Sequence, residues 1–188
     1  LPAATAVPSR LHAAQRYSVL GPGKRIRPAL VYATAATLGI PLDEVDAAAC
    51  AVELIHCYSL VHDDLPAMDD DALRRGRPTT HVVHGDGLAI LAGDGLLTDA
   101  FWVLAADHSP AVPTGSPVAP AIQRLRAVAT LAAAAGSPGM VGGQAIARSK
   151  SKPARSSSRI DRRLSGDTIA TSRDRPQWSR AWSSTART

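Results

Sequence analysis

The sequence predicts an all-α protein, an antiparallel helix bundle followed by a basic tail. Apolar residues make up 45% of the 188 residues, yet only one Phe, three Tyr and three Trp occur, so Ala, Leu and Val must form the core. A composition rich in Ala and Leu and poor in aromatic residues favours helices over strands. Long apolar stretches are separated by Gly- and Pro-containing breaks, as expected between helices. The length fits one domain with a core of its own.

Each break places the end of one expected helix and the start of the next. A short amphipathic helix is expected over 9–20, followed by a turn at Gly21-Pro22-Gly23. Asp43 is the expected N-cap of a later helix, and Thr79 or Thr80 of a short turn. The longer helices are expected over 26–38, 44–65, 88–106 and 119–135, with a last one beginning at residue 140.

Charge divides the chain into two parts. Residues 1–147 carry ten Lys/Arg and thirteen Asp/Glu, whereas residues 148–188 carry eleven and three. The second part is rich in Ser and Arg, and its apolar residues follow neither the helical nor the strand periodicity. We therefore expect a disordered tail there. Trp178 and Trp182 stand among its arginines, but no groove-reading motif accompanies them, and we expect no nucleic acid partner.

Cysteine use and hydropathy indicate a cytoplasmic protein without a membrane span. Cys50 and Cys57 are seven apart on one expected helix, roughly 10 Å along its axis, which is too far for a disulfide. They are typical of small buried residues in a reducing compartment. The apolar stretch 88–106 contains Asp94 and Asp99, which favours a bundle helix over a transmembrane one.

The densest charge pattern lies at residues 63–71, where five aspartates occur, followed by Arg74, Arg75 and Arg77. Such a cluster repels itself unless cations bind to it, and hard oxygen ligands suit Mg²⁺, which completes its shell with water and phosphate oxygens. Guanidinium groups bind phosphate bidentately. The pattern indicates a metal-diphosphate site. The alternative is a solvated helix end, but the nearly uncharged approach 47–61 counts against it.

Pro66 is expected to shape this acidic segment. Asp63 and Asp69 are six apart, about 120° out of register on an ideal helix. Because Pro66 removes a helical hydrogen bond, we expect a kink or bulge that turns Asp69 back toward Asp63 and Asp64. His56 shares the helix face of Asp63. It is either a core histidine whose hydrogen bonds are made within the protein or a hydrogen-bond donor to phosphate.

A second basic cluster precedes the helix expected at residue 26. Lys24, Arg25 and Arg27 lie near a helix N-terminus, where backbone N–H groups add to the attraction of an anion. A short basic cluster is also common on ordinary protein surfaces. Taken by itself, this cluster leaves both interpretations open.

Five segments follow one another in a fixed order over residues 17–146. They are Gly23-Lys24-Arg25-Ile26-Arg27-Pro28, the stretch from Glu53 to Asp69, Leu73-Arg74-Arg75-Gly76, Leu91-Ala92-Gly93-Asp94 and Gly139-Met140-Val141-Gly142-Gly143-Gln144-Ala145. In these segments the chain resembles the trans-isoprenyl diphosphate synthases, or polyprenyl synthetases, above all bacterial farnesyl diphosphate synthases. The resemblance implies a bundle of the isoprenoid synthase type around a central cavity.

The resemblance also implies a reaction and its site. A prenyltransferase of this family condenses an allylic diphosphate, dimethylallyl or geranyl, with isopentenyl diphosphate by metal-assisted ionisation, condensation and deprotonation. Mg²⁺ would be held on the allylic diphosphate by Asp63, Asp64 and Asp69, with Arg74 assisting. The diphosphate of isopentenyl diphosphate would be held by Lys24, Arg27, His56 and Arg75. Intact relatives are expected to form homodimers.

Product length is the finer implication of the resemblance. Tyr58, five residues before Asp63, and the two extra residues inside the acidic motif resemble the arrangement that limits the product to fifteen carbons. Bulk at Cys57 and Tyr58, about one turn below the metal face, would block further growth of the chain. A wider pocket would suit a geranylgeranyl product.

The chain departs from the family pattern after about residue 147. Residues 147–188 contain no second aspartate-rich motif, no Lys-Thr pair before it and no Gln just upstream. We expect that the C-terminal half is missing or replaced through a shifted reading frame, which translation of the DNA in its other two frames would reveal, and that activity is impaired. The alternative function is a non-catalytic partner subunit or decoy of an intact synthase.

Overall fold

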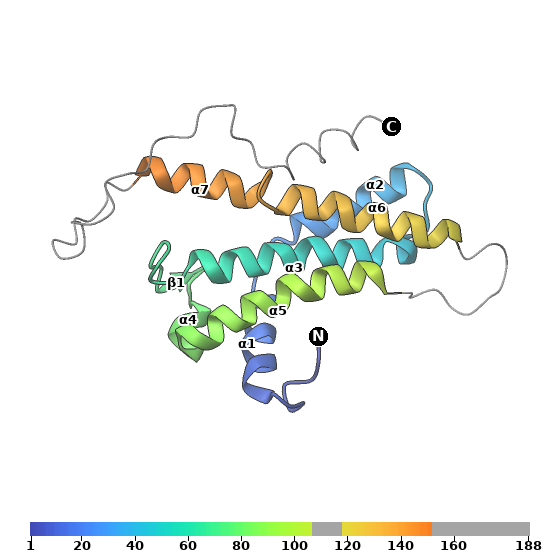
Figure 1. Ribbon diagram of the computed structural model, residues 1–188. Helices are drawn as coiled ribbons and strands as arrows, with labels where there is room; N and C mark the ends of the chain where they lie inside the picture. The colour runs from blue at the N-terminus through green and yellow to red at the C-terminus, as the bar shows by residue number, and fades with distance from the viewer. Residues whose placement is uncertain (107–117, 152–188) are drawn as a thin grey trace. The chain divides into compact units, whose positions relative to one another are not determined.

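The computed structural model describes residues 1–106 and 118–151 (Figure 1). The chain divides into two units, 1–146 and 147–188, and the description below concerns the first, apart from the end of its last helix. In the described residues the elements are α1 Ser9–Val19, α2 Ile26–Thr37, the 3₁₀ turn η1 Leu42–Val45, α3 Asp46–Asp63, β1 Leu73–Arg74, β2 Arg77–Pro78, α4 Thr80–His84, α5 Asp86–Ala105, α6 Val118–Ala135 and α7 Met140–Ser151. The predicted all-α class is confirmed.

Helices α3 and α5 lie side by side and form the centre of the bundle (Figure 1). Their contact is built mostly from aliphatic and small side chains, as the composition predicted. A Cβ at Gly93 would collide with the ring of His62, so glycine in α5 leaves the space that this side chain of α3 occupies. The buried residues of this core are Ala51, Leu54, Ile55, Cys57, Tyr58, Leu96, Ala100, Leu104 and Ala135, the last from α6.

Helix α5 is long and apolar enough to span a membrane by length and composition alone. Its buried face, which includes Leu96 and Ala100, packs in the protein core against α3. Asp99 on the same helix accepts a hydrogen bond from the buried Gln15 of α1, with 3.4 Å between Nε2 and Oδ2. The polar partner and the packed face fit the predicted bundle helix.

Helix α3 is shorter than predicted at both ends. Residues 42–45 form a 3₁₀ turn, so the helix begins at Asp46 with Val45 at the N-cap, and the prediction of Asp43 as N-cap was wrong. Asp46 instead accepts a hydrogen bond from the Tyr32 hydroxyl at 2.7 Å. At the other end the helix stops at Asp63, because Pro66 has no N–H to continue the ladder.

The sequence did not predict the short antiparallel hairpin of β1 and β2, in which Leu73 pairs with Pro78 and Arg74 with Arg77. Its turn has Arg75 at φ 54° and Gly76 at φ 75°. Positive φ at both central residues is typical of a type I′ turn, so the Arg-Gly pair was the available signal. Strands of two residues leave the helical class unchanged.

The predicted boundary at residue 147 falls inside helix α7, which continues to Ser151. Ala145, Ile146, Ala147 and Arg148 are tolerated well in a helix, which explains the continuation. Most of the predicted loop over 107–120 and of the predicted tail lies outside the described residues.

Candidate functional site, a basic pocket and an acidic turn

The basic cluster of Lys24, Arg25 and Arg27, at the junction of the α1–α2 loop with α2, uses one of its three cations for its own structure. Arg25 adopts a left-handed conformation with φ 50°. Its guanidinium donates to the Glu53 carboxylate and to the carbonyl oxygens of Val19 and Gly21, at 2.6 and 2.7 Å. Lys24 and Arg27 are exposed, and neither has an ion-pair partner in the described part of the chain. Two cations therefore remain for a ligand.

A pocket of about 380 Å³ opens beside this loop. The four residues predicted to hold a diphosphate line it together, although they come from four separate segments: the loop, the first turn of helix α2, helix α3 and the hairpin turn. Glu53 and Arg25 form part of the same wall. The pocket is thus cationic, and its predicted ligand residues are Lys24, Arg27, His56 and Arg75.

The surroundings of His56 in this pocket favour its neutral form. Partial burial lowers the pKa of its imidazole below the usual 6.5, and the neighbouring Arg27 lowers it further. A neutral imidazole offers one N–H donor and one acceptor. His56 can therefore donate a hydrogen bond to an anion while the cations supply the charge.

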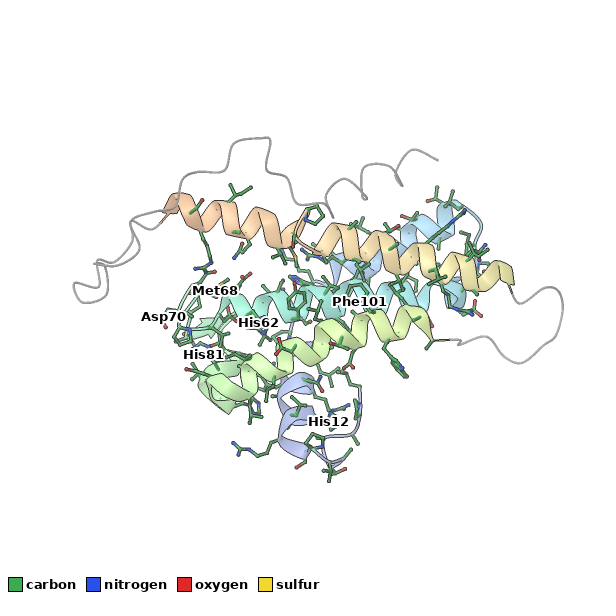
Figure 2. The ribbon with its side chains drawn as sticks, viewed as in Figure 1. His12, His62, Met68, Asp70, His81 and Phe101 are labelled. Atoms are coloured by element: carbon green, nitrogen blue, oxygen red, sulfur yellow. The ribbon has the colours of Figure 1, made fainter. Side chains whose placement is uncertain are left out.

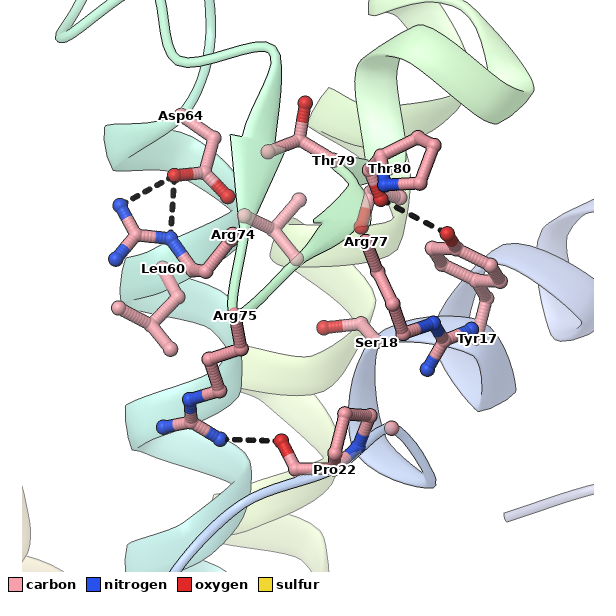
Figure 3. Close-up of a pocket in the computed structure, with 13 residues that line it drawn as sticks. Tyr17, Ser18, Pro22, Leu60, Asp64, Arg74, Arg75, Arg77, Thr79 and Thr80 are labelled. Carbon is pink, nitrogen blue, oxygen red and sulfur yellow. Dashed lines mark hydrogen bonds and ion pairs between the residues drawn. The ribbon is translucent and has the colours of Figure 1, made fainter.

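The hairpin brings Arg75 to the basic pocket. Its Nη1 donates to the Pro22 carbonyl at 2.6 Å, a contact drawn in Figure 3. A Cβ at Gly23 would collide with the same Nη1, so glycine provides the space for this approach. Arg75 also lines a second pocket of about 70 Å³, which Figure 3 shows between the hairpin, α1 and α3.

The acidic segment turns back on itself after α3 rather than continuing as a kinked helix. The Asp69 N–H donates to the Asp63 carbonyl at 2.8 Å, which returns the backbone of Asp69 to the end of α3. Leu65 and Met68 anchor the turn by packing with Val61 of α3 and Ala89 of α5. Figure 2 shows Met68 and Asp70 beyond the C-terminal end of α3.

Asp64 and Arg74 neutralise one another in this turn. Asp64 is only 4% exposed, and its Oδ1 accepts from Arg74 Nε at 2.6 Å and lies 2.5 Å from Nη2 (Figure 3). The same guanidinium lies 3.3 Å from Asp71 Oδ2. Hydrogen bonding to Asp64 raises the pKa of Arg74 above its usual value. The hairpin is therefore fastened to the end of α3.

Asp63 and Asp64 face different neighbours. Asp63 Oδ1 accepts a hydrogen bond from Gln144 Nε2 of α7 at 2.8 Å. Asp64 lies with Leu60 in the smaller pocket, next to the pocket that contains His56. Asp63 lines neither pocket, whereas Asp64 continues the row of pocket residues along α3.

The carboxylates fit Mg²⁺ in their chemistry and only partly in their arrangement. Mg²⁺ commonly binds one or two carboxylates and keeps its other ligands as water or phosphate oxygens. Among the residues that the structure describes, no three His, Cys, Asp or Glu side chains are placed to share one ion. Asp64 is engaged by Arg74. Metal binding at Asp63, Asp64 and Asp69 stays a prediction.

The residues predicted to limit product length are buried in the core. Burial raises the pKa of the Cys57 thiol to about 11. Burial also raises the pKa of Tyr58, and the negative charge of Asp63 raises it by a smaller amount. The Tyr58 ring meets that of His62 edge-on, with 5.7 Å between the ring centroids. Neither residue lines the two pockets described above. Their role in product length stays a prediction.

Sequence reasoning missed the residues that hold the site together. In the sequence Arg25 is one of three neighbouring cations, and its partner Glu53 lies 28 residues away. Tyr17 was not singled out, yet its hydroxyl donates to the Pro78 carbonyl at 2.8 Å, 61 residues away. Only the fold brings these pairs together, so no local spacing signals them. Gln144 lies in the last of the five family segments, and its partner Asp63 is 81 residues away.

Comparison with known proteins identifies relatives of this chain. The farnesyl diphosphate synthase of Geobacillus stearothermophilus is 50% identical over 138 residues, 73% of this chain and 44% of that protein. The farnesyl diphosphate synthase of Escherichia coli is 48% identical over 157 residues, 82% of this chain and 50% of that protein. The chain thus spans about half the length of the curated relatives it matches.

A solved structure shows the same fold. The crystal structure of an FPP/GFPP synthase from Zymomonas mobilis, without ligand, matches with a TM-score of 0.71 and 42% identity, over 79% of this chain and 51% of that one. The sequence model of the family described as Polyprenyl synthetase matches residues 8–152, most of the chain and all of the pocket and turn described above. On these grounds the chain belongs to the polyprenyl synthetase family.

Proposed function

We propose that this chain forms part of the active site of a cytoplasmic prenyltransferase, namely the part that binds diphosphate groups. Such an enzyme joins an allylic diphosphate to isopentenyl diphosphate. The proposal rests chiefly on the meeting of Lys24, Arg27, His56 and Arg75 around one pocket. Family membership and the names of the relatives support it. The allylic substrate would be dimethylallyl or geranyl diphosphate, and the product farnesyl or geranylgeranyl diphosphate.

In the basic pocket, each side chain has a separate task toward the diphosphate of isopentenyl diphosphate. Lys24 and Arg27 supply positive charge that no described carboxylate compensates. Arg75 has N–H groups left beyond the one that bonds Pro22, and a guanidinium binds phosphate through two of them at once. His56 donates one hydrogen bond from a neutral ring. Together they would orient the double bond toward the acidic turn.

At the acidic turn, Asp63, Asp64 and Asp69 would hold Mg²⁺, and Arg74 would bind the allylic diphosphate. Bound Mg²⁺ would neutralise the charge that develops on a departing diphosphate. In the reaction the allylic C–O bond breaks, the double bond of isopentenyl diphosphate forms the new C–C bond, and the released proton passes to the free diphosphate. Bulk at Cys57 and Tyr58 would set the product length.

We expect this chain to bind isopentenyl diphosphate with little turnover, because residues 147–188 contain no second aspartate-rich motif. Titration calorimetry with isopentenyl diphosphate tests the pocket directly. Lys24→Gln and Arg27→Gln should each weaken binding about tenfold, since each removes a charged partner of phosphate. The matched control is Arg126→Gln on the exposed part of α6. A wild-type chain that does not bind, or equal losses in the control, would refute the proposal.

The second candidate function is a non-catalytic partner subunit of an intact synthase. Large apolar side chains exposed on three helices favour association with another chain: Leu30 is 62% exposed, Trp102 66% and Leu125 68%. Co-expression with a full-length synthase distinguishes the two candidates. Stable co-purification with changed activity of that synthase supports the partner role, and separate elution refutes it.

A further inference from the structure

The hairpin of β1 and β2 is too short to fix the positions of its own arginine side chains. Each strand contains two residues, and an isolated two-stranded hairpin is only marginally stable in water. Its turn has positive φ at Arg75 and Gly76. The direction in which Arg75 projects must therefore be set by contacts from outside the hairpin.

Helix α1 provides such a contact through Tyr17. The Tyr17 hydroxyl donates to the Pro78 carbonyl at 2.8 Å, and the Arg77 Cζ lies 4.2 Å from the centroid of the same ring (Figure 3). One side chain thus binds both residues of β2. On another side the ring meets His84 of α4 edge-on, with centroids 5.4 Å apart, which limits its movement.

The loop after α1 continues this contact toward the basic pocket. A Cβ at Gly21 would lie 2.7 Å from Arg77 Nη1, and one at Gly23 would collide with Arg75 Nη1. The Pro22 carbonyl between them accepts the Arg75 hydrogen bond. The end of α1 and this loop therefore form one surface on which the hairpin lies with its arginines in fixed places.

We infer that Tyr17 is a positioning residue that holds the hairpin on α1, so that Arg75 projects into the pocket with Lys24, Arg27 and His56. Tyr17 itself does not line that pocket. Its effect on a ligand passes through β2 and the turn to Arg75. The inference rests on the proposed function, because Arg75 is the residue that would touch diphosphate.

Calorimetry on the full 188-residue chain, with isopentenyl diphosphate and with inorganic pyrophosphate, tests the inference. Tyr17→Phe keeps the ring beneath Arg77 and removes only the hydroxyl donor, so both ligands should bind about two- to tenfold more weakly. The matched control is Tyr32→Phe, which removes a hydroxyl donor to Asp46 on another surface. This control should leave both affinities unchanged.

A double-mutant cycle separates positioning from general destabilisation. If Tyr17 acts through Arg75, Tyr17→Phe should have almost no effect on affinity once Arg75→Gln is present. A loss of equal size in both backgrounds would overturn the inference. If the wild-type chain binds and Tyr17→Phe binds as well as wild type, the positioning role fails while the proposed function stands.

A measurement without ligand keeps the inference testable if the proposed function fails. The ¹⁵N resonance of Arg75 Nε reports how firmly that side chain is held in the free chain. Tyr17→Phe should shift and broaden it and should speed hydrogen exchange of the Thr79 amide, which bonds the Ala72 carbonyl at the base of the hairpin. Unchanged signals would overturn the positioning role whether or not the chain binds diphosphate.

Discussion

Lys24 and Arg25 are adjacent cations with different tasks. Arg25 bonds Glu53, whose side chain is 12% exposed, and two backbone carbonyls. Arg25→Gln would leave the Glu53 carboxylate without its guanidinium partner, so we expect the free energy of unfolding to fall by about 1–3 kcal/mol. Urea denaturation followed by circular dichroism measures this loss.

The neighbouring substitution Lys24→Gln is its control. Lys24 is exposed and forms no ion pair within the described ranges, so its removal should change stability by less than about 0.5 kcal/mol. Its effect should be on diphosphate affinity instead. Equal destabilisation by the two variants would contradict the division of tasks between them.

The pH dependence of stability should reflect His56. Because burial and Arg27 lower the pKa of His56 in the folded chain, the unfolded chain takes up a proton first as the pH falls below 6.5. Stability should therefore be greatest above pH 6.5 and decrease below it. His84, whose pKa burial also lowers, contributes in the same direction. His56→Gln should flatten this decrease.

The test is to measure the free energy of unfolding from one pH unit above to one unit below 6.5. The chains compared are wild type, His56→Gln and His56→Gln/His84→Gln. The slope should become smaller with each histidine removed. If the slope of the double variant equals that of wild type, the histidines are not the cause.

At the scale of the elements, the loop of residues 21–23 and the hairpin depend on one another. Gly23→Ala would push away the flexible end of Arg75, which can move at little cost in stability. We expect isopentenyl diphosphate to bind about three- to tenfold more weakly while the free energy of unfolding changes by less than about 1 kcal/mol. Calorimetry and urea denaturation give the two quantities.

Gly87→Ala in the first turn of α5 is the matched control. A Cβ there meets nothing within 4 Å, so the change should leave affinity intact and raise stability slightly. Weakened binding in this variant would show that the effect of Gly23→Ala is not specific to Arg75.

Helices could be predicted from the sequence because their signals are local. Gly and Pro mark where α1, α2 and α6 begin or end, and the Ala-rich composition fits the close packing of α3 and α5. The hairpin was missed because two residues per strand leave no alternating pattern to detect. Pro66 signalled a change of direction, but its position alone does not distinguish a kink from the end of a helix.

The sequence names residues of the candidate site but does not show how they are connected. Lys24, Arg27, His56 and Arg75 line one pocket, and each belongs to a recognisable motif. The pairing of Asp64 with Arg74 and of Asp63 with Gln144 depends on tertiary contacts across 10 and 81 residues. Such contacts have no signature in the spacing of residues along the chain.

At the scale of the whole molecule, exposed apolar side chains should cause association. Trp102, Leu125 and Leu38 are each about two thirds exposed, at 66, 68 and 67%. We expect the chain to self-associate or to be poorly soluble as its concentration rises, because these side chains lose contact with water on association. Sedimentation velocity should show this behaviour, and Leu125→Glu should reduce it. A monomer at every concentration would contradict the expectation.

The ion pair of the buried Asp64 with the partly exposed Arg74 implies thermodynamic coupling between two kinds of ligand. An anion that recruits Arg74 leaves a carboxylate that is only 4% exposed without its counter-charge, and a divalent cation would restore the balance. By linkage, each ligand would then strengthen the binding of the other by the same factor. Pyrophosphate titrations at increasing Mg²⁺ should show this cooperativity in wild type. Asp64→Asn should abolish it, and equal Mg²⁺ dependence in both chains would show that the pair does not couple the ligands.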